Sequence, residues 1–206
     1  MIKAVLFDLD DTLLRLNLTA FLARYVAGAA SLLAQAARTS PAALALPYAR
    51  SFLAIDSQDR RDSLTNERLF NQTFFSACGI PLDDPAIHDL VDYYEREVVP
   101  GYSGGIVAAR PVEGAREAIE AVWSAGLTCA LATNPTFSLA CDQARMGWAG
   151  VSVDDFALVS THANSTRCKP SVRYYQEFAN QLGMRLEECL MVGNDARRDI
   201  VSPDCG

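Results

Sequence analysis

The chain has 206 residues, enough for one large domain or for a core domain that carries a smaller one. Half of the residues are hydrophobic and 21% are charged, as in ordinary soluble globular proteins. The net charge of −7 argues against a nucleic-acid partner, because phosphate backbones bind to basic surfaces. It does not exclude an anionic small molecule, because a bound divalent cation inverts the local field.

The cellular compartment is predicted from what the chain lacks. A strand-like segment that carries Asp8 and Asp10 follows Met1 at once, so we expect no signal peptide. Apolar stretches such as residues 25–37 are too short, and too rich in Ala, Gly and Ser, to suggest a membrane span. The six cysteines lie far apart, without a C-x-x-C pair, which favours reduced thiols. We therefore expect a cytoplasmic protein without a membrane partner, as a monomer or homodimer.

Four apolar runs predict buried strands of a parallel sheet. Residues 2–7 form a nearly continuous apolar run, and similar runs recur at 127–132, 156–159 and 189–192. Helical patterns separate the later runs: one over residues 112–125, and one that begins at Ser171 and ends at Gly183. Strands that alternate with helices predict an α/β fold with a doubly wound, mainly parallel sheet.

The stretch over residues 16–107 has a different pattern, without β-α alternation. Helical signals cover residues 17–38, a segment that begins at Ser40-Pro41, and residues 63–78 and 84–99. We expect Pro47 to kink or split the second of these helices. The Gly-rich return over residues 100–105 is a candidate hinge. The organisation predicted is a core domain of residues 1–15 and 108–206, with an all-helical insertion over 16–107.

Polar side chains follow each predicted strand, where ligands bind in open α/β sheets. They are Asp8 and Asp10 after the first strand, Thr133 and Asn134 after the second, Lys169 beyond the third, and Asn194, Asp195 and Asp199 after the fourth. Each has a simpler interpretation alone, as a capping turn, a surface lysine or a partner of a helix dipole. Their shared place at the strand ends favours one site instead, and the set suits metal-assisted phosphoryl transfer.

The chemistry of these groups predicts how they divide the work. The repulsion between the Asp8 and Asp10 carboxylates is acceptable if a divalent cation binds one of them while the other exchanges a proton. Either Asp195 or Asn194 completes an all-oxygen ligand set of the kind that Mg²⁺ prefers.

The groups of the other strand ends suit a phosphoryl ligand. The Thr133 hydroxyl and the Asn134 backbone amide are candidate donors to phosphate oxygens. Lys169 supplies a positive charge to the phosphoryl group and to the attacking carboxylate.

These residues also form four motifs in order along the chain. Residues 8–13, Asp-Leu-Asp-Asp-Thr-Leu, match a D-x-D-x-T pattern after a hydrophobic strand, Thr133 matches the second motif and Lys169-Pro170 the third. Residues 193–195, with Asp199, match an acidic fourth motif. Together the chain resembles the haloacid dehalogenase-like (HAD) hydrolases over essentially its whole length. The helical insertion stands where that family has its type I cap.

The resemblance implies a role for each matched residue. Asp8 would attack phosphorus and become an aspartyl-phosphate, and Asp10 would protonate the leaving alcohol and then activate water. Mg²⁺ would be held by the Asp8 side chain, the Asp10 backbone carbonyl and an acidic residue of the fourth motif. Thr133 and Lys169 would bind the phosphoryl group. Asp199 would orient Lys169 or a metal-bound water.

The sequence departs from the family pattern in two places. Asn194 stands where the first Asp of the fourth motif would follow Gly193, so either Asn194 or Asp195 faces the metal, and charge favours Asp195. Relatives generally continue beyond this motif with another strand and helix, so we expect that a C-terminal piece is missing or reduced.

The expected function is a Mg²⁺-dependent phosphatase for a small phosphorylated metabolite. The alternatives are a HAD-like binding or regulatory module with weak catalysis, a haloacid dehalogenase, or a receiver-like signalling domain. Asp10 argues against dehalogenation, because a halide needs no proton, and receivers lack a large helical insertion. Candidates for substrate selection are Arg15, Asn17, Tyr25 and Tyr102, near the two ends of the insertion.

Overall fold

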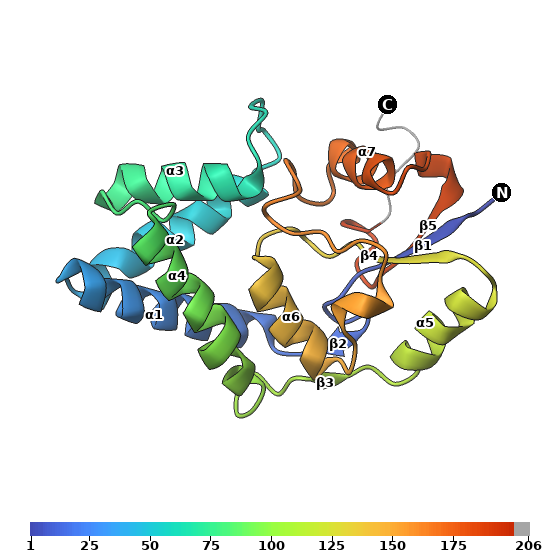
Figure 1. The fold of residues 1–206 in the computed structure, drawn as a ribbon, viewed down its shortest axis with the longest axis horizontal. Coiled ribbons are helices and arrows are strands. Elements are labelled where there is room, and N and C mark those ends of the chain that lie inside the picture. The colour runs from blue at the N-terminus through green and yellow to red at the C-terminus, as the bar shows by residue number, and fades with distance from the viewer. Residues whose placement is uncertain (200–206) are drawn as a thin grey trace.

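Three parallel strands form the sheet that supports the rest of the chain (Figure 1). The computed structural model describes residues 1–199, and the strands are β1 (Ala4–Phe7), β4 (Thr128–Leu131) and β5 (Cys189–Val192). Their order is β4-β1-β5, with Phe7 level with both Leu131 and Val192. Because this register is even, all three strands end at the same edge of the sheet.

Helices cover both faces of the sheet. Val5 and Phe7 of β1 belong to the hydrophobic cluster that includes residues of α5 (Ala115–Ser124) and α6 (Leu139–Trp148). Leu6 points to the other face, in a second cluster with residues of α7 (Val172–Gln181). Alternate residues of one strand therefore contact helices on opposite faces. The doubly wound, mainly parallel α/β fold is confirmed.

Two of the predicted strands differ from the expectation. Residues 156–159 pair with β4 only at Val159, opposite Leu131, although three backbone hydrogen bonds of 2.8 to 2.9 Å hold the segment beside β4. A 3₁₀ turn, Val153–Asp155, immediately precedes it and shortens the extended stretch. On β5, Leu190 and Val192 are 49% and 36% exposed. That strand is therefore half-buried on one face and exposed on the other, whereas the apolar run predicted burial on both faces.

The insertion is entirely helical in its long elements. Strand β2 (Leu14–Arg15) leaves the core and pairs antiparallel with β3 (Arg110–Pro111), which re-enters it. Between them lie α1 (Leu18–Ala37), α2 (Pro41–Asp56), α3 (Asn66–Cys78) and α4 (Pro85–Tyr93). The predicted helical cap is thus observed as an architecture, and its boundaries at residues 16 and 107 stay predictions.

Two details of the cap differ from the sequence prediction. Helix α2 continues through Pro47 without a break, although a proline removes one backbone hydrogen bond and costs about 3 kcal/mol. Pro47 is buried, so the contacts of α2 with α1 and α3 offset this cost. The helix predicted over residues 84–99 ends earlier, because a π-helical turn (Tyr94–Val98) and a 3₁₀ turn (Val99–Tyr102) replace its last part. The predicted hinge over residues 100–105 begins within this 3₁₀ turn, and its motion stays a prediction.

Helix α1 lies within the stretch of residues 17–38 for which the sequence predicted a helix. It has 20 residues with a mean hydropathy of 1.2, so by length and composition alone it passes the test for a membrane span. The apolar stretch over residues 25–37, predicted to be too short for a membrane span, is thus part of a longer helix. One of its faces nevertheless packs in the core of the cap, where Phe21, Tyr25 and Leu33 are at most 2% exposed. This packing explains its apolar composition without a membrane.

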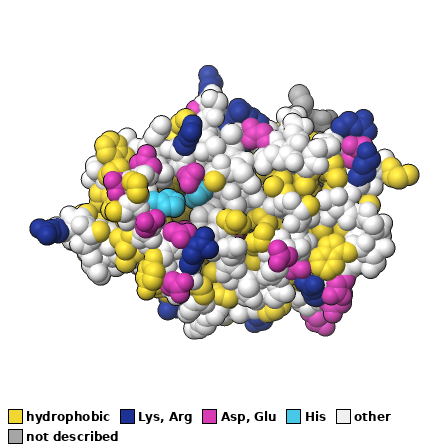
Figure 2. Space-filling view, viewed as in Figure 1, with side chains coloured by type: hydrophobic (Ala, Val, Ile, Leu, Met, Phe, Trp, Pro, Cys, Tyr) yellow, Lys and Arg dark blue, Asp and Glu magenta, His cyan; other side chains and the backbone are white. Residues whose placement is uncertain are grey.

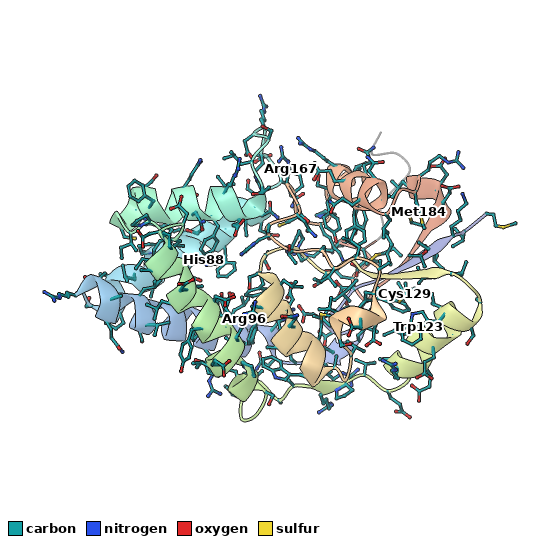
Figure 3. All side chains as sticks on the ribbon, viewed as in Figure 1. His88, Arg96, Trp123, Cys129, Arg167 and Met184 are labelled. Carbon is teal, nitrogen blue, oxygen red and sulfur yellow. The ribbon has the colours of Figure 1, made fainter. Side chains whose placement is uncertain are left out.

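The cap is joined to the core by both apolar and polar contacts. Phe137 of the core lies among the aromatic rings of the cap, 5.2 Å from the ring centre of Tyr25. The buried Asn66 side chain at the start of α3 donates to the Pro135 carbonyl at 2.9 Å. Arg167, labelled at this junction in Figure 3, donates to the carbonyl of Asp62 at 2.6 Å. These contacts hold the cap against the loops that carry Asn134 and Lys169.

The same junction predicts a pH-dependent stability. The His162 carbonyl accepts from the Glu67 amide of α3 at 2.9 Å, and Nδ1 of His162 is buried without a partner. Burial, and secondly the charge of His88, lower the pKa of His162 to about 4. Between about pH 6.5 and pH 4 the unfolded chain therefore binds a proton that the folded chain does not. Stability is full above this range and is lost as the pH falls through it.

We expect the His162→Gln variant to lose less stability on acidification than the unsubstituted protein, by roughly 1 to 2 kcal/mol between pH 7 and 4.5. Denaturant unfolding at both pH values measures the difference. His88→Gln is the comparison variant, because His88 is the only other histidine and is exposed. It removes only the second cause of the lowered pKa, so most of the pH dependence should remain. An unchanged pH dependence in His162→Gln would contradict the assignment.

Candidate active site

A cavity of about 390 Å³ lies between the strand ends and the cap. Seven of the eight residues predicted for the site line it: Asp8, Asp10, Asn134, Lys169, Asn194, Asp195 and Asp199. The eighth, Thr133, is buried next to Asn134 and is 1% exposed. The even register of the strands explains why residues so far apart in sequence meet here.

Lys169 joins two carboxylates at the floor of the cavity. Its Nζ donates to Asp8 Oδ1 at 2.8 Å and to Asp199 Oδ1 at 2.7 Å, and the side chain is 1% exposed. Burial raises the pKa of Asp8 to about 6, and the ammonium group of Lys169 opposes this rise. A charged Asp8 in this place therefore depends on nearby positive charge.

The loop after β5 places the acidic fourth motif. Asp199 Oδ2 accepts from the Asp195 amide at 3.0 Å, so one carboxylate orients both this loop and Lys169. Gly193 makes the arrangement possible, because a Cβ atom at this position would overlap the Asp199 carboxylate. Asn194 is exposed to the cavity and Asp195 is half-buried. Both therefore remain candidates for the metal.

A buried arginine that the sequence analysis missed contacts Asp10. Arg145 of α6 donates to Asp10 Oδ2 and, at 2.6 Å, to Asp142 Oδ1. Arg145 and Asp142 are 1% and 0% exposed, and the guanidinium lies 5.0 Å from the ring centre of Phe137. Asp10 Oδ1 is buried without a partner. The available sequence signal was the spacing of Asp142 and Arg145 on a helix face rich in small apolar residues.

The side chain of Asn134 connects Lys169 of the core with Asp56 of the cap. Its side-chain oxygen accepts from the Lys169 amide at 3.1 Å, and its Nδ2 donates to Asp56 Oδ1 at 3.2 Å. Arg198 also donates to Asp56, at 3.2 Å. The side chain of Asn134 is thus occupied, so only its backbone amide remains a candidate phosphate donor. Asp56, at the end of α2, is a cap residue of the site that the sequence analysis missed.

The predicted residues for substrate selection do not line this cavity. Arg15 is exposed on β2, and Asn17 caps α1 by accepting from the Ala20 amide. The hydroxyl of Tyr25 donates to Glu95 at 2.5 Å inside the cap, and Tyr102 contacts Tyr94. The cap residues that line the cavity are instead Leu18, Leu22, Phe52, Leu53 and Asp56. Their identity depends on how α1 and α2 turn toward the core, which the sequence pattern does not specify.

The residues present fit a partly hydrated Mg²⁺ ion. Within residues 1–199, no three acidic, imidazole or thiol side chains come close enough to form a complete metal cage. Mg²⁺ does not need one, because it keeps several waters and binds through one or two carboxylates. Oxygen donors of Asp8, Asn194 and Asp195 line one cavity, and the unpartnered Asp10 Oδ1 lies beside them. This donor set is hard and acidic, as Mg²⁺ prefers.

Comparison with known proteins defines the class. A family model for haloacid dehalogenase-like hydrolases matches residues 2–202. The chain therefore belongs to the haloacid dehalogenase-like hydrolases. No curated protein sequence matches it significantly.

Solved structures agree with this fold. A HAD phosphatase from Thermococcus onnurineus is 18% identical with a TM-score of 0.54, over 96% of this chain and 80% of that one. CbbY from Rhodobacter sphaeroides, a mutant in complex with xylulose-(1,5)bisphosphate, is 18% identical with a TM-score of 0.56, over 93% and 77%. The putative HAD-hydrolase YfnB from Bacillus subtilis, bound to magnesium, is 17% identical with a TM-score of 0.51, over 97% and 82%.

Proposed function

We propose that this chain is a Mg²⁺-dependent phosphatase that hydrolyses a small phosphorylated metabolite through an aspartyl-phosphate. One observation carries the proposal: Lys169 joins Asp8 to Asp199 in a cavity that Asp10 also lines. A carboxylate nucleophile, a second carboxylate and a buried ammonium group are the set that phosphoryl transfer through a covalent intermediate requires. The family of the chain and the neighbouring HAD phosphatase support the same reaction class.

The proposed steps assign one task to each side chain. Asp8 attacks phosphorus while Lys169 neutralises charge on the phosphoryl oxygens, and Asp10 gives a proton to the leaving alcohol. Asp10 then takes a proton from the water that attacks the aspartyl-phosphate. We assign these transfers to Asp10 Oδ1, because Arg145 holds the other oxygen.

The metal supports this chemistry electrostatically. Bound Mg²⁺ would lower the repulsion between the nucleophile and the phosphate dianion. Asp8, the Asp10 backbone carbonyl and either Asp195 or Asn194 would hold it. The Bacillus structure is described as bound to magnesium and shares the fold of this chain, and this shared fold is the support that it gives to the assignment.

Removal of the metal tests the proposal. With p-nitrophenyl phosphate as substrate, we expect EDTA to lower the rate at least 100-fold, because Asp8 and the substrate then repel each other without compensation. Excess Mg²⁺ should restore the rate. Full turnover in the presence of EDTA would contradict the proposal.

Two variants separate the candidate metal ligands. The variant that removes the true ligand, Asn194→Ala or Asp195→Ala, should raise the Mg²⁺ concentration for half-maximal rate by about tenfold or more. The other variant serves as its matched control, because the two positions are adjacent.

A further inference from the structure

The cavity has two walls of opposite character. The core side carries the carboxylates and Lys169, whereas the cap side carries Leu18 and Leu22 of α1 and Phe52 and Leu53 of α2. Phe137 continues this apolar wall from the core. Leu18 and Leu53 are 38% and 72% exposed, so they present apolar surface at the cavity without being buried by the protein itself. A phosphate bound at Asp8 would direct its organic part toward this wall.

Within residues 1–199, every cation that lines the cavity is already paired. Lys169 contacts Asp8 and Asp199, and Arg145 contacts Asp142 at 2.6 Å as well as Asp10. Arg198 contacts Asp56 at 3.2 Å. Against these three cations the lining holds six carboxylates, those of Asp8, Asp10, Asp11, Asp56, Asp195 and Asp199.

A neighbouring cavity also has carboxylates in its lining, beside aromatic side chains and both histidines. It measures about 90 Å³ and shares Phe52, Thr136 and Phe137 with the first. Glu67, Asp92 and Glu95 line it. Figure 2 shows acidic side chains gathered around the two histidines on this face of the molecule. A substrate that extended past Phe52 would therefore also meet carboxylates.

Resting on the phosphatase function proposed above, we infer that the substrate is a monophosphate of an apolar, uncharged alcohol. The apolar wall formed by Leu18, Leu22, Phe52, Leu53 and Phe137 binds the organic part by excluding water from it. A second anion on the substrate finds no unpaired cation among the described residues that line the cavity, and the carboxylate excess repels it. Bisphosphates and carboxylate-bearing phosphates are therefore poor substrates.

Matched phosphate esters test this inference. The n-alkyl phosphates from ethyl to hexyl should show kcat/KM rising about two- to fourfold for each methylene, until the wall is covered. The 5-carboxypentyl ester has the length of hexyl phosphate but ends in a carboxylate, and we expect its kcat/KM to be at least tenfold lower. The 6-aminohexyl ester carries the opposite charge. Its ammonium group would lose water against the apolar wall, so its kcat/KM should not exceed that of hexyl phosphate.

A substitution in the apolar wall should change the preference. Leu53→Lys places an unpaired cation at the cavity and should raise kcat/KM for the carboxylate ester, relative to hexyl phosphate, about tenfold. Leu46→Lys is the matched control, because Leu46 lies two turns earlier on α2, is 55% exposed and does not line the cavity. It should leave the ratio of the two esters unchanged.

The outcomes separate the two proposals. A flat chain-length series, an equal rate for the carboxylate ester, or a preference for the amino ester would overturn this inference while leaving the phosphatase function intact. Failure to hydrolyse any ester in Mg²⁺ would overturn the phosphatase function and this inference with it.

Discussion

The Asp8→Asn variant is expected to lose at least 10⁴-fold of the phosphatase activity, because an amide does not displace an alcohol from phosphorus. The fold should survive the change. Burial already raises the pKa of Asp8 to about 6, so a neutral side chain of the same shape is tolerated there. Lys169 keeps its contact with Asp199 at 2.7 Å. Steady-state kinetics and thermal unfolding, measured on the same preparation, separate the two effects.

Asp11→Asn is a matched control within the same stretch. Asp11 has a positive φ of 56° in the turn after β1, which asparagine adopts at least as readily as aspartate. We expect it to retain activity within about tenfold, because no chemical step is assigned to its carboxylate. A covalent phosphate on Asp8 after acid quenching would identify the nucleophile directly. An Asp8→Asn variant with substantial activity would contradict the covalent mechanism.

Arg145→Met should give the largest loss of stability, about 3 to 5 kcal/mol in the free energy of unfolding. The substitution keeps an unbranched apolar stem but leaves the Asp142 carboxylate, which is 0% exposed, without its cation. Burial, opposed by Arg145, already raises the pKa of Asp142 to about 7. Without the arginine the carboxylate must take up a proton or remain charged in an apolar setting, and both cost free energy. Urea unfolding measures the change.

A second substitution tests whether the uncompensated charge is the cause. Arg145→Met combined with Asp142→Asn should recover a large part of the lost stability, because the buried charge is then gone. Activity should remain low in the double variant, since Asp10 still lacks the contact that holds its Oδ2. Losses that simply add would show that cavity formation, rather than charge, dominates.

Local patterns in the sequence predicted the central strand of the core and the helices of the cap. The apolar run at residues 4–7 is buried on both faces, as its composition predicted, because a central parallel strand has helices on each side. Asn17, Ser40, Thr65 and Asp84 precede the helices of the cap and cap them through their side chains. Pro47 does not split α2, because the cost of a proline is local whereas the packing that offsets it involves α1 and α3. A kink at Pro47 stays a prediction.

The sequence by itself determined which groups could react. Asp8 and Asp10 come directly after a predicted strand, and Lys169 and Asp199 follow later strands. Such residues meet because the strands of a parallel sheet end at one edge. Only the tertiary structure decided how those groups are held. Arg145 contacts Asp10 across 135 positions of sequence, and Leu53 of α2 lines the same cavity as the residues of the core. Such contacts depend on the packing of helices against one another, which a local pattern of residues does not encode.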